Sequence, residues 1–253
     1  MLVESKLVEK NMRYSIDFED MERKIVENNV KAYILCNPHN PVSRVWRKEE
    51  VEKVLEICKK HNVLLISDEI HQDLIFKGLE NTSLINYVPQ YNRILVATAA
   101  SKTFNLAGCQ NSFILIADEK MREQFDEYTL RNKTISGNSF GYIAVEAAYK
   151  CGKPWLEEVK SIIYASHLYI KEELEGFKGI RVSDLEGTYL MWIDIREALG
   201  NRDIHEFMEK KCKLDFDYGE WFGGKEYEGF IRFNLATSKE ITEKAVAAIK
   251  ENL

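Results

Sequence analysis

The stretch Ala99-Ala100-Ser101-Lys102-Thr103-Phe104-Asn105-Leu106-Ala107-Gly108 places one lysine just past an apolar run, Ile94-Leu95-Val96-Ala97, and before a glycine-bearing turn. The apolar run predicts a buried strand that ends shortly before Lys102. A lysine is a nucleophile only after it has lost its proton, and a semi-buried position beside polar groups lowers the pKa of a lysine in that direction. The position suits a lysine that forms a Schiff base, although an isolated Ser-Lys-Thr is more typical of a surface lysine.

Two further apolar runs, upstream of this stretch, also end in polar residues. Residues 31–36 lead into Asn37-Pro38-His39-Asn40-Pro41, where proline ends the strand, and residues 63–66 lead into Ser67-Asp68-Glu69-Ile70-His71. In a parallel sheet, ligands bind at the carboxyl ends of the strands. The pattern therefore favours a ligand site, while an ordinary proline loop and a solvated strand end remain the alternatives.

The three strand ends, which carry Asn40, Asp68 and Lys102 in this order, resemble the core of a pyridoxal-phosphate enzyme of the aspartate-aminotransferase fold. Five motifs in the order of that family extend the resemblance along nearly the whole chain. Within the class I/II aminotransferases they are most similar to the cysteine-S-conjugate β-lyase and cystathionine β-lyase group of the MalY/PatB type. The motifs are residues 36–46 (CNPHNPVSRVW), 67–71 (SDEIH), 101–108 (SKTFNLAG), 187–192 (GTYLMW) and 230–236 (FIRFNLA).

The resemblance implies an α/β fold of PLP-transferase type I, with the mainly parallel sheet of a large domain and a small C-terminal α+β domain. Alternating strand and helix patterns agree with it. We expect residues 1–153 to form the C-terminal part of the large cofactor-binding domain, 154–176 a linking helix and 177–253 the small domain. Helices are predicted near residues 18–25, 51–58, 121–132, 143–150, 155–174, 204–211 and 242–252, and further strands near 113–116, 180–182, 188–195 and 229–235.

By the same resemblance, Lys102 binds the aldehyde of pyridoxal 5'-phosphate and, once substrate has displaced it, moves the proton at the substrate Cα. Asp68 resembles the carboxylate that faces the pyridine nitrogen and keeps it protonated, which strengthens the ring as an electron sink. Lys102 is therefore the expected catalytic residue, and both residues are expected to bind the cofactor.

Three further side chains are given roles by the resemblance. Asn40 resembles the amide that donates to the phenolic oxygen of the cofactor. His71 stands where many aminotransferases have a tyrosine for the same oxygen, with a helix-packing histidine as the alternative. Arg232 resembles the arginine that binds the substrate α-carboxylate, because its planar fork matches a carboxylate as lysine cannot.

The chain also departs from the family pattern. Aminotransferases usually have an arginine eight residues after the lysine, against the cofactor phosphate, where this chain has Gln110; the lyase group often lacks it too. Ala99 stands in place of a phosphate-binding serine, and Ser101 or Thr98 is expected to substitute for it. Ser43 stands where a turn glycine is usual, and we expect it to cap the helix that follows.

Family members carry an N-terminal segment that supplies the first strands, a helix whose N-terminus binds the cofactor phosphate, and an aromatic residue that stacks on the ring. We expect this segment to be missing, since residues 2–7 resemble the link just before the Asn-Pro strand. Its loss predicts weak cofactor binding. Three explanations for the expected absence remain open, namely a gene fragment, a mis-started reading frame and one piece of a split enzyme.

The composition fits a soluble cytoplasmic enzyme. Lys and Arg together number 35 against 41 Asp and Glu, a net charge of -6, and no basic run is long enough to follow a phosphate backbone, which argues against a nucleic-acid partner. The sequence contains no apolar run of membrane-spanning length and no signal peptide, so a membrane partner is not expected. Five scattered cysteines indicate free thiols in a reducing compartment, and the histidines show no metal-ligand spacing.

The leading hypothesis is a PLP-dependent carbon–sulfur β-lyase that releases pyruvate, ammonia and a thiol from an S-substituted cysteine such as cystathionine. The first alternative is a class I/II aminotransferase, which shares the early steps; Gln110 and His71 favour the lyase through resemblance. The second alternative is a truncated, non-catalytic fragment or a regulatory or binding protein. As family members are homodimers that share active-site residues, a homodimer is expected.

Overall fold

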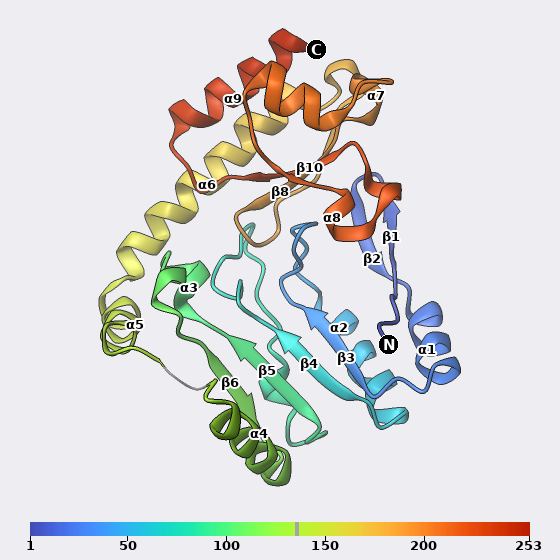
Figure 1. The fold of residues 1–253 in the computed structure, drawn as a ribbon, viewed down its shortest axis with the longest axis vertical. Helices are drawn as coiled ribbons and strands as arrows, with labels where there is room; N and C mark the ends of the chain where they lie inside the picture. Colours follow the sequence, from blue (N-terminus) through green and yellow to red (C-terminus); the bar gives the residue numbers. More distant parts are fainter. Residues whose placement is uncertain (135–136) are drawn as a thin grey trace.

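Two four-stranded sheets and a two-stranded hairpin form the framework of the protein. The structure is a computed structural model that describes residues 1–134 and 137–253. Figure 1 shows the larger sheet in the lower half of the molecule and the smaller sheet above it, with the long helix α6 (Lys153–Leu174) along one side. No helix in these described ranges combines the length and apolar character needed to cross a membrane.

The larger sheet has the strand order β3-β4-β5-β6. Its strands are β3 (Ala32–Cys36), β4 (Leu64–Asp68), β5 (Ile94–Thr98) and β6 (Phe113–Ile116), all at positions that the apolar runs predicted. The first three are parallel and β6 is antiparallel. Cys36 pairs with Asp68, which pairs with Ala97, so the three parallel strands end level with one another.

Helices α1 (Phe18–Glu27) and α2 (Lys48–Lys60) cover one face of the larger sheet, and their apolar stripes cause this packing. Met21 and Val54 pack with sheet residues such as Leu65 in one buried cluster. Asp17 is the N-cap of α1, since its side chain accepts from the backbone N–H of Asp20 at 2.9 Å. The opposite sheet face includes Ile34, which is 68% exposed.

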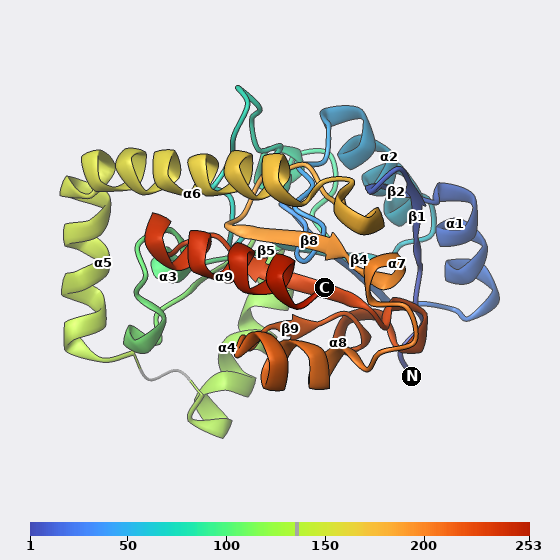
Figure 2. The same cartoon turned by 90° about the horizontal axis from the view of Figure 1, so that it is seen from above.

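The smaller sheet has the order β7-β8-β10-β9 and is antiparallel. Its strands are β7 (Arg181–Val182), β8 (Leu190–Asp194), β9 (Asp217–Tyr218) and β10 (Phe230–Asn234); β9 was not predicted from the sequence. Helices α6 and α9 (Lys239–Asn252) bury their apolar stripes against it. Viewed from above in Figure 2, α6 and α9 lie over β8 and β10.

The remaining elements connect these layers. They are α3 (Ala100–Thr103), α4 (Glu119–Asn132), α5 (Ser139–Cys151), α7 (Arg196–Leu199), α8 (Glu220–Gly223), a π-helix (Glu206–Cys212) and the 3-10 turns Leu84–Tyr87, Ala107–Cys109, Phe177–Gly179 and Lys225–Tyr227. The predicted helix at 204–211 is thus a π-helix. The division of the chain at residues 153 and 176 stays a prediction.

A hairpin of β1 (Leu7–Lys10) and β2 (Arg13–Ile16) precedes α1 and was not predicted. Tyr14 lies in a buried cluster with Trp192 and Phe230 of the smaller sheet. The indole N–H of Trp192 donates to the Tyr14 hydroxyl at 3.2 Å. The first residues of the chain therefore pack against strands near its other end.

The turn after β3 corrects one prediction. Ser43 does not cap α2; Arg47 occupies the N-cap position, and its backbone N–H donates to the Glu50 carboxylate at 2.8 Å. Ser43 has φ +58° and is fully buried, which explains why glycine suits this turn. Its hydroxyl donates instead to the carbonyl of Leu190 in β8.

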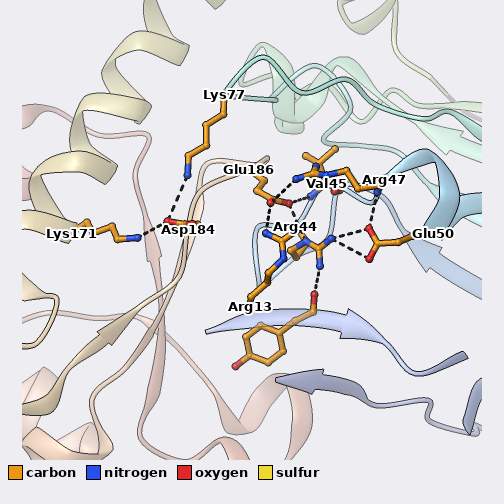
Figure 3. A network of polar contacts seen from close by, with 10 residues as sticks. Arg13, Arg44, Val45, Arg47, Glu50, Lys77, Lys171, Asp184 and Glu186 are labelled. Atoms are coloured by element: carbon orange, nitrogen blue, oxygen red, sulfur yellow. Dashed lines mark hydrogen bonds and ion pairs between the residues drawn. The ribbon is translucent and has the colours of Figure 1, made fainter. Parts of the chain in front are cut away.

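Glu186, in the loop before β8, joins three parts of the chain (Figure 3). Its carboxylate accepts from Arg44 at 3.0 Å, from Arg13 at 2.7 Å and from Arg47 at 2.9 Å. The backbone N–H of Val45 donates to it at 3.1 Å. Burial works to raise the pKa of Glu186, but the hydrogen bonds of Arg13 and Val45 and the charge of Arg44 hold it below its ordinary value.

We expect Glu186→Gln to lower the free energy of unfolding by about 3 kcal/mol, because it removes the buried carboxylate charge that pairs with Arg44 and leaves Glu50 as the remaining carboxylate partner of that arginine. Urea denaturation at pH 7 measures this. Glu226→Gln, which breaks the exposed pair with Lys6, serves as the control and should cost less than about 1 kcal/mol. Equal effects of the two substitutions would contradict the central role of Glu186.

Candidate functional site

The carboxyl ends of β3, β4 and β5 bring the predicted site segments to one edge of the larger sheet. Because the strands end level, the loops that carry Asn40, His71 and Lys102 leave the sheet side by side. The X-Pro bonds Asn37-Pro38 and Asn40-Pro41 are both cis in the first of these loops. This edge faces the smaller sheet, from which Arg232 approaches.

Asn40 and Arg232 are in direct contact, although they are far apart in the sequence. The guanidinium Nη1 of Arg232 donates to the side-chain oxygen of Asn40 at 2.7 Å. This bond fixes the Asn40 amide, so that its NH2 group is the part left to donate to another partner. The contact joins the sheet edge to β10 of the smaller sheet.

Arg232 has two more neighbours, of which Asp217 was not predicted from the sequence. Nη2 is ion-paired with Asp217, its partner on the adjacent strand β9. The Phe222 ring lies 4.8 Å from the guanidinium carbon, in cation–π geometry. The Nε–H is buried and has no hydrogen-bond partner among the described residues. Arg232 is thus held on three sides, and its buried Nε–H is left to donate to another group.

His71 is buried, and its ring packs edge-on against Tyr189 with 5.5 Å between the ring centroids. Burial, together with the positive charges of Lys102 and Arg232, lowers the pKa of His71 to about 4. The imidazole is therefore neutral at pH 7 and can act as a hydrogen-bond donor or acceptor. Its Nδ1 is buried without a partner in the described part of the chain.

Lys102 and Ser101 line a cavity of about 660 Å³ between α3, α6 and the end of β10. Its other lining residues include Trp155, Tyr189 and Asn234. Lys102 is half-buried, which agrees with the semi-buried position expected for a lysine nucleophile. Tyr189 also contacts His71, so the cavity and the histidine share a wall. Tyr189 belongs to the motif at residues 187–192, but its place in the site was not predicted.

Asp68 is the last residue of β4 and is half-buried. One of its oxygens accepts from the backbone N–H of Ile70 at 3.2 Å. The thiol of Cys36, opposite Asp68 on β3, has its pKa raised to about 11 by burial and by the Asp68 charge. Asp68 is not among the residues that line the Lys102 cavity, so the structure places it at the same sheet edge without bringing it into that cavity.

Thr98 and Ser101, the two residues expected to bind the cofactor phosphate in place of the usual serine, lie in different surroundings. The Thr98 hydroxyl donates to the Glu69 carbonyl at 3.2 Å and accepts from Gln72 at 3.0 Å, whereas Ser101 opens into the Lys102 cavity. Gln110 lines a different cavity, beside β6. Of the two hydroxyls, Ser101 is the better placed to bind a ligand near Lys102.

The family description "Aminotransferase class I and II" matches residues 3–249 of the chain. Cystathionine beta-lyase PatB of Bacillus subtilis is 36% identical over 100% of this chain and 66% of its own length. Cystalysin of Treponema denticola, in a crystal structure with pyridoxal 5'-phosphate, superposes with a TM-score of 0.92 at 37% identity. The PLP-bound C-S lyase of Staphylococcus hominis superposes with a TM-score of 0.91 at 32% identity.

The coverage of these matches is unequal. The two superpositions cover 99% of this chain but 64% of each solved chain. The chain therefore spans slightly less than two thirds of the proteins that it resembles. The likeness confirms the predicted fold, that of the aspartate-aminotransferase-like PLP enzymes, over the part of it that this chain contains.

We expect His71 to make the protein less stable in acid. Its folded pKa of about 4 lies below the ordinary value of 6.5, so its contribution to stability is complete above pH 6.5 and is lost as the pH falls toward 4. When the pH is lowered from 7 to 5, the free energy of unfolding should fall by about 1–2 kcal/mol less in His71→Gln than in the wild type. Urea denaturation at both pH values measures the difference.

Gln110→Asn, an exposed exchange of one neutral amide for another, is the control and should keep the wild-type pH dependence. If His71→Gln shows the same pH dependence as the wild type, the imidazole is not held in its neutral form.

Proposed function

Because the chain belongs to the aminotransferase class I and II family, we propose that it acts as a pyridoxal-phosphate-dependent carbon–sulfur β-lyase. The substrate class is the S-substituted L-cysteines, including cystathionine. The overall reaction consumes water and releases a thiol, pyruvate and ammonia. The similarity to PatB, cystalysin and a C-S lyase, each at more than 30% identity, favours this chemistry within the family.

The polar groups at the sheet edge fit pyridoxal phosphate. The buried Nδ1 of His71 has no partner in the described ranges, and the Asn40 amide has a donor to spare once its oxygen is bound to Arg232. Both match a phenolic oxygen. Asp68 suits a protonated ring nitrogen, Ser101 suits the phosphate, and Lys102 suits the aldehyde. These five residues would hold the cofactor.

When bound, pyridoxal phosphate supplies an aldehyde for the substrate amine and a ring that accepts the electron pair left at Cα. The protein contributes the other parts. Arg232 would bind the α-carboxylate and orient the Cα–H bond, and Lys102 would take the proton from Cα. The C–S bond at Cβ then breaks with both electrons leaving on sulfur as a thiolate.

The contact between Asn40 and Arg232 carries this proposal. Asn40 suits the cofactor and Arg232 suits the substrate carboxylate. Because the two side chains touch, a cofactor and a substrate bound to them would lie next to each other. Arg232 is 17% exposed, which keeps most of its charge away from solvent and strengthens its attraction for a carboxylate.

The test is the visible absorbance of the purified chain with added pyridoxal phosphate, compared with Lys102→Ala. We expect a visible absorbance band of a lysine-bound pyridoxal cofactor only when Lys102 is present, because only its amine can bind the aldehyde covalently at this site. Pyruvate release from cystathionine should then follow the band. A chain that shows no band with excess cofactor would contradict the proposal for this chain alone.

An aminotransferase is the second candidate, because the family includes this activity and the same groups would serve it. The product distinguishes the two. Pyruvate formed without an added keto acid supports the lyase, and an acceptor-dependent keto acid supports the aminotransferase.

We also propose that the protein is a homodimer in the cytoplasm. The five cysteines, all within the described ranges, are free thiols, which fits a reducing compartment. Light scattering of the purified chain measures the assembly state.

Arg232→Lys should raise KM for an S-substituted cysteine by about 10-fold to 100-fold with a smaller change in kcat, because an ammonium cannot form the two parallel hydrogen bonds of the guanidinium. Steady-state kinetics of pyruvate release measure both constants. Arg131→Lys, on the exposed surface of α4, is the matched control. An unchanged KM would exclude Arg232 as the carboxylate-binding residue.

A further inference from the structure

The Nη2 edge of Arg232 already faces a carboxylate of the chain itself. Asp217 lies opposite Arg232 in the register of β9 and β10, and the two side chains form an ion pair. The Asp217 side chain is 42% exposed, whereas that of Arg232 is 17% exposed. A ligand carboxylate that binds Arg232 must therefore share the guanidinium with a fixed negative charge.

A cavity of about 520 Å³ opens at this ion pair. Asp215, Asp217 and Arg232 are its charged lining residues in the described part of the chain, and Trp221 forms part of its wall. Two carboxylates and one guanidinium give the cavity an excess of negative charge. A ligand with one carboxylate can satisfy Arg232, but a second carboxylate would meet Asp217 and Asp215.

We propose that Asp217 is a specificity-determining residue, which makes the Arg232 site prefer ligands with one carboxylate and disfavour those that bring a second carboxylate with no ammonium group beside it to balance its charge. The proposal rests on the proposed function in one respect, namely that Arg232 binds the carboxylate of the substrate. It deepens that function by excluding the acidic amino acids as substrates and by retaining S-substituted cysteines whose distal group has no net negative charge. Cystathionine belongs to the retained group, because its distal carboxylate has an ammonium group beside it.

The size of the effect follows from Coulomb's law. Two unit charges about 4 Å apart repel by about 1 kcal/mol even in bulk water, and more at a partly buried site. This corresponds to at least about a fivefold preference for the monocarboxylate. Asp217→Asn removes the charge and keeps an amide oxygen that can accept from Nη2, so it separates charge from packing.

Butyrate and succinate are suitable probes, because both have four carbons and differ in the second carboxylate. Each is titrated at pH 7 into the full chain without cofactor, and the indole N–H signal of Trp221, assigned with Trp221→Phe, is followed by two-dimensional NMR. The wild type should bind butyrate at least about fivefold more tightly than succinate. Asp217→Asn should remove most of this difference.

Asp126→Asn, which makes the same charge change on the exposed side of α4, is the matched control and should keep the wild-type preference. The same preference in Asp217→Asn and the wild type overturns the proposal. A loss of affinity for both probes in Asp217→Asn also overturns it, since Asp217 would then serve to orient Arg232.

The failure of the proposed function gives a different result. If Arg232→Lys leaves the binding of both probes unchanged, or if neither probe binds the wild type, Arg232 is not a carboxylate site. That result contradicts both the selectivity set by Asp217 and the proposed role of Arg232 in the lyase. If the probes behave as expected but Lys102 gives no cofactor band, the selectivity stands and the lyase activity of this chain does not.

Discussion

The ion pairs of Glu186 are the interaction on which the other contacts of the site depend. A buried carboxylate is costly unless it is paired, and Glu186 is satisfied by Arg13 of the hairpin, Arg44 of the turn after β3 and Arg47 at the start of α2. The network therefore ties the loop before β8 to the segment that carries Asn40 (Figure 3). The direct hydrogen bond from Arg232 to Asn40 then adds a second link between this segment and the smaller sheet.

From this anchor, the site is assembled by two sheets that contribute different chemistry. The parallel sheet supplies its strand ends, with Asp68 and Lys102, because parallel strands direct their carboxyl ends to one edge. The antiparallel sheet supplies Arg232 from β10. Burial, helped by the Lys102 and Arg232 charges, keeps His71 neutral, and a neutral imidazole is the form that can both donate and accept a hydrogen bond.

Arg232 shows how one side chain can be both structural and functional. Asn40, Asp217 and the Phe222 ring fix its guanidinium, so little conformational entropy remains to be lost when a ligand binds. The same neighbours set the electrostatic character of the site. An acidic neighbour makes a carboxylate site selective, because it weakens binding in proportion to the negative charge that the ligand brings.

The sequence by itself determined the α/β fold, the strands that end near Asn40, Asp68 and Lys102, and the helices with clear apolar stripes, because burial imposes a local periodicity on the residues that form these elements. Tertiary structure alone decided the hairpin β1-β2, the left-handed turn at Ser43, the wall formed by Tyr189 and the pairing of Asp217 with Arg232. These features depend on contacts between residues distant in the chain, and no local pattern of side chains records such contacts.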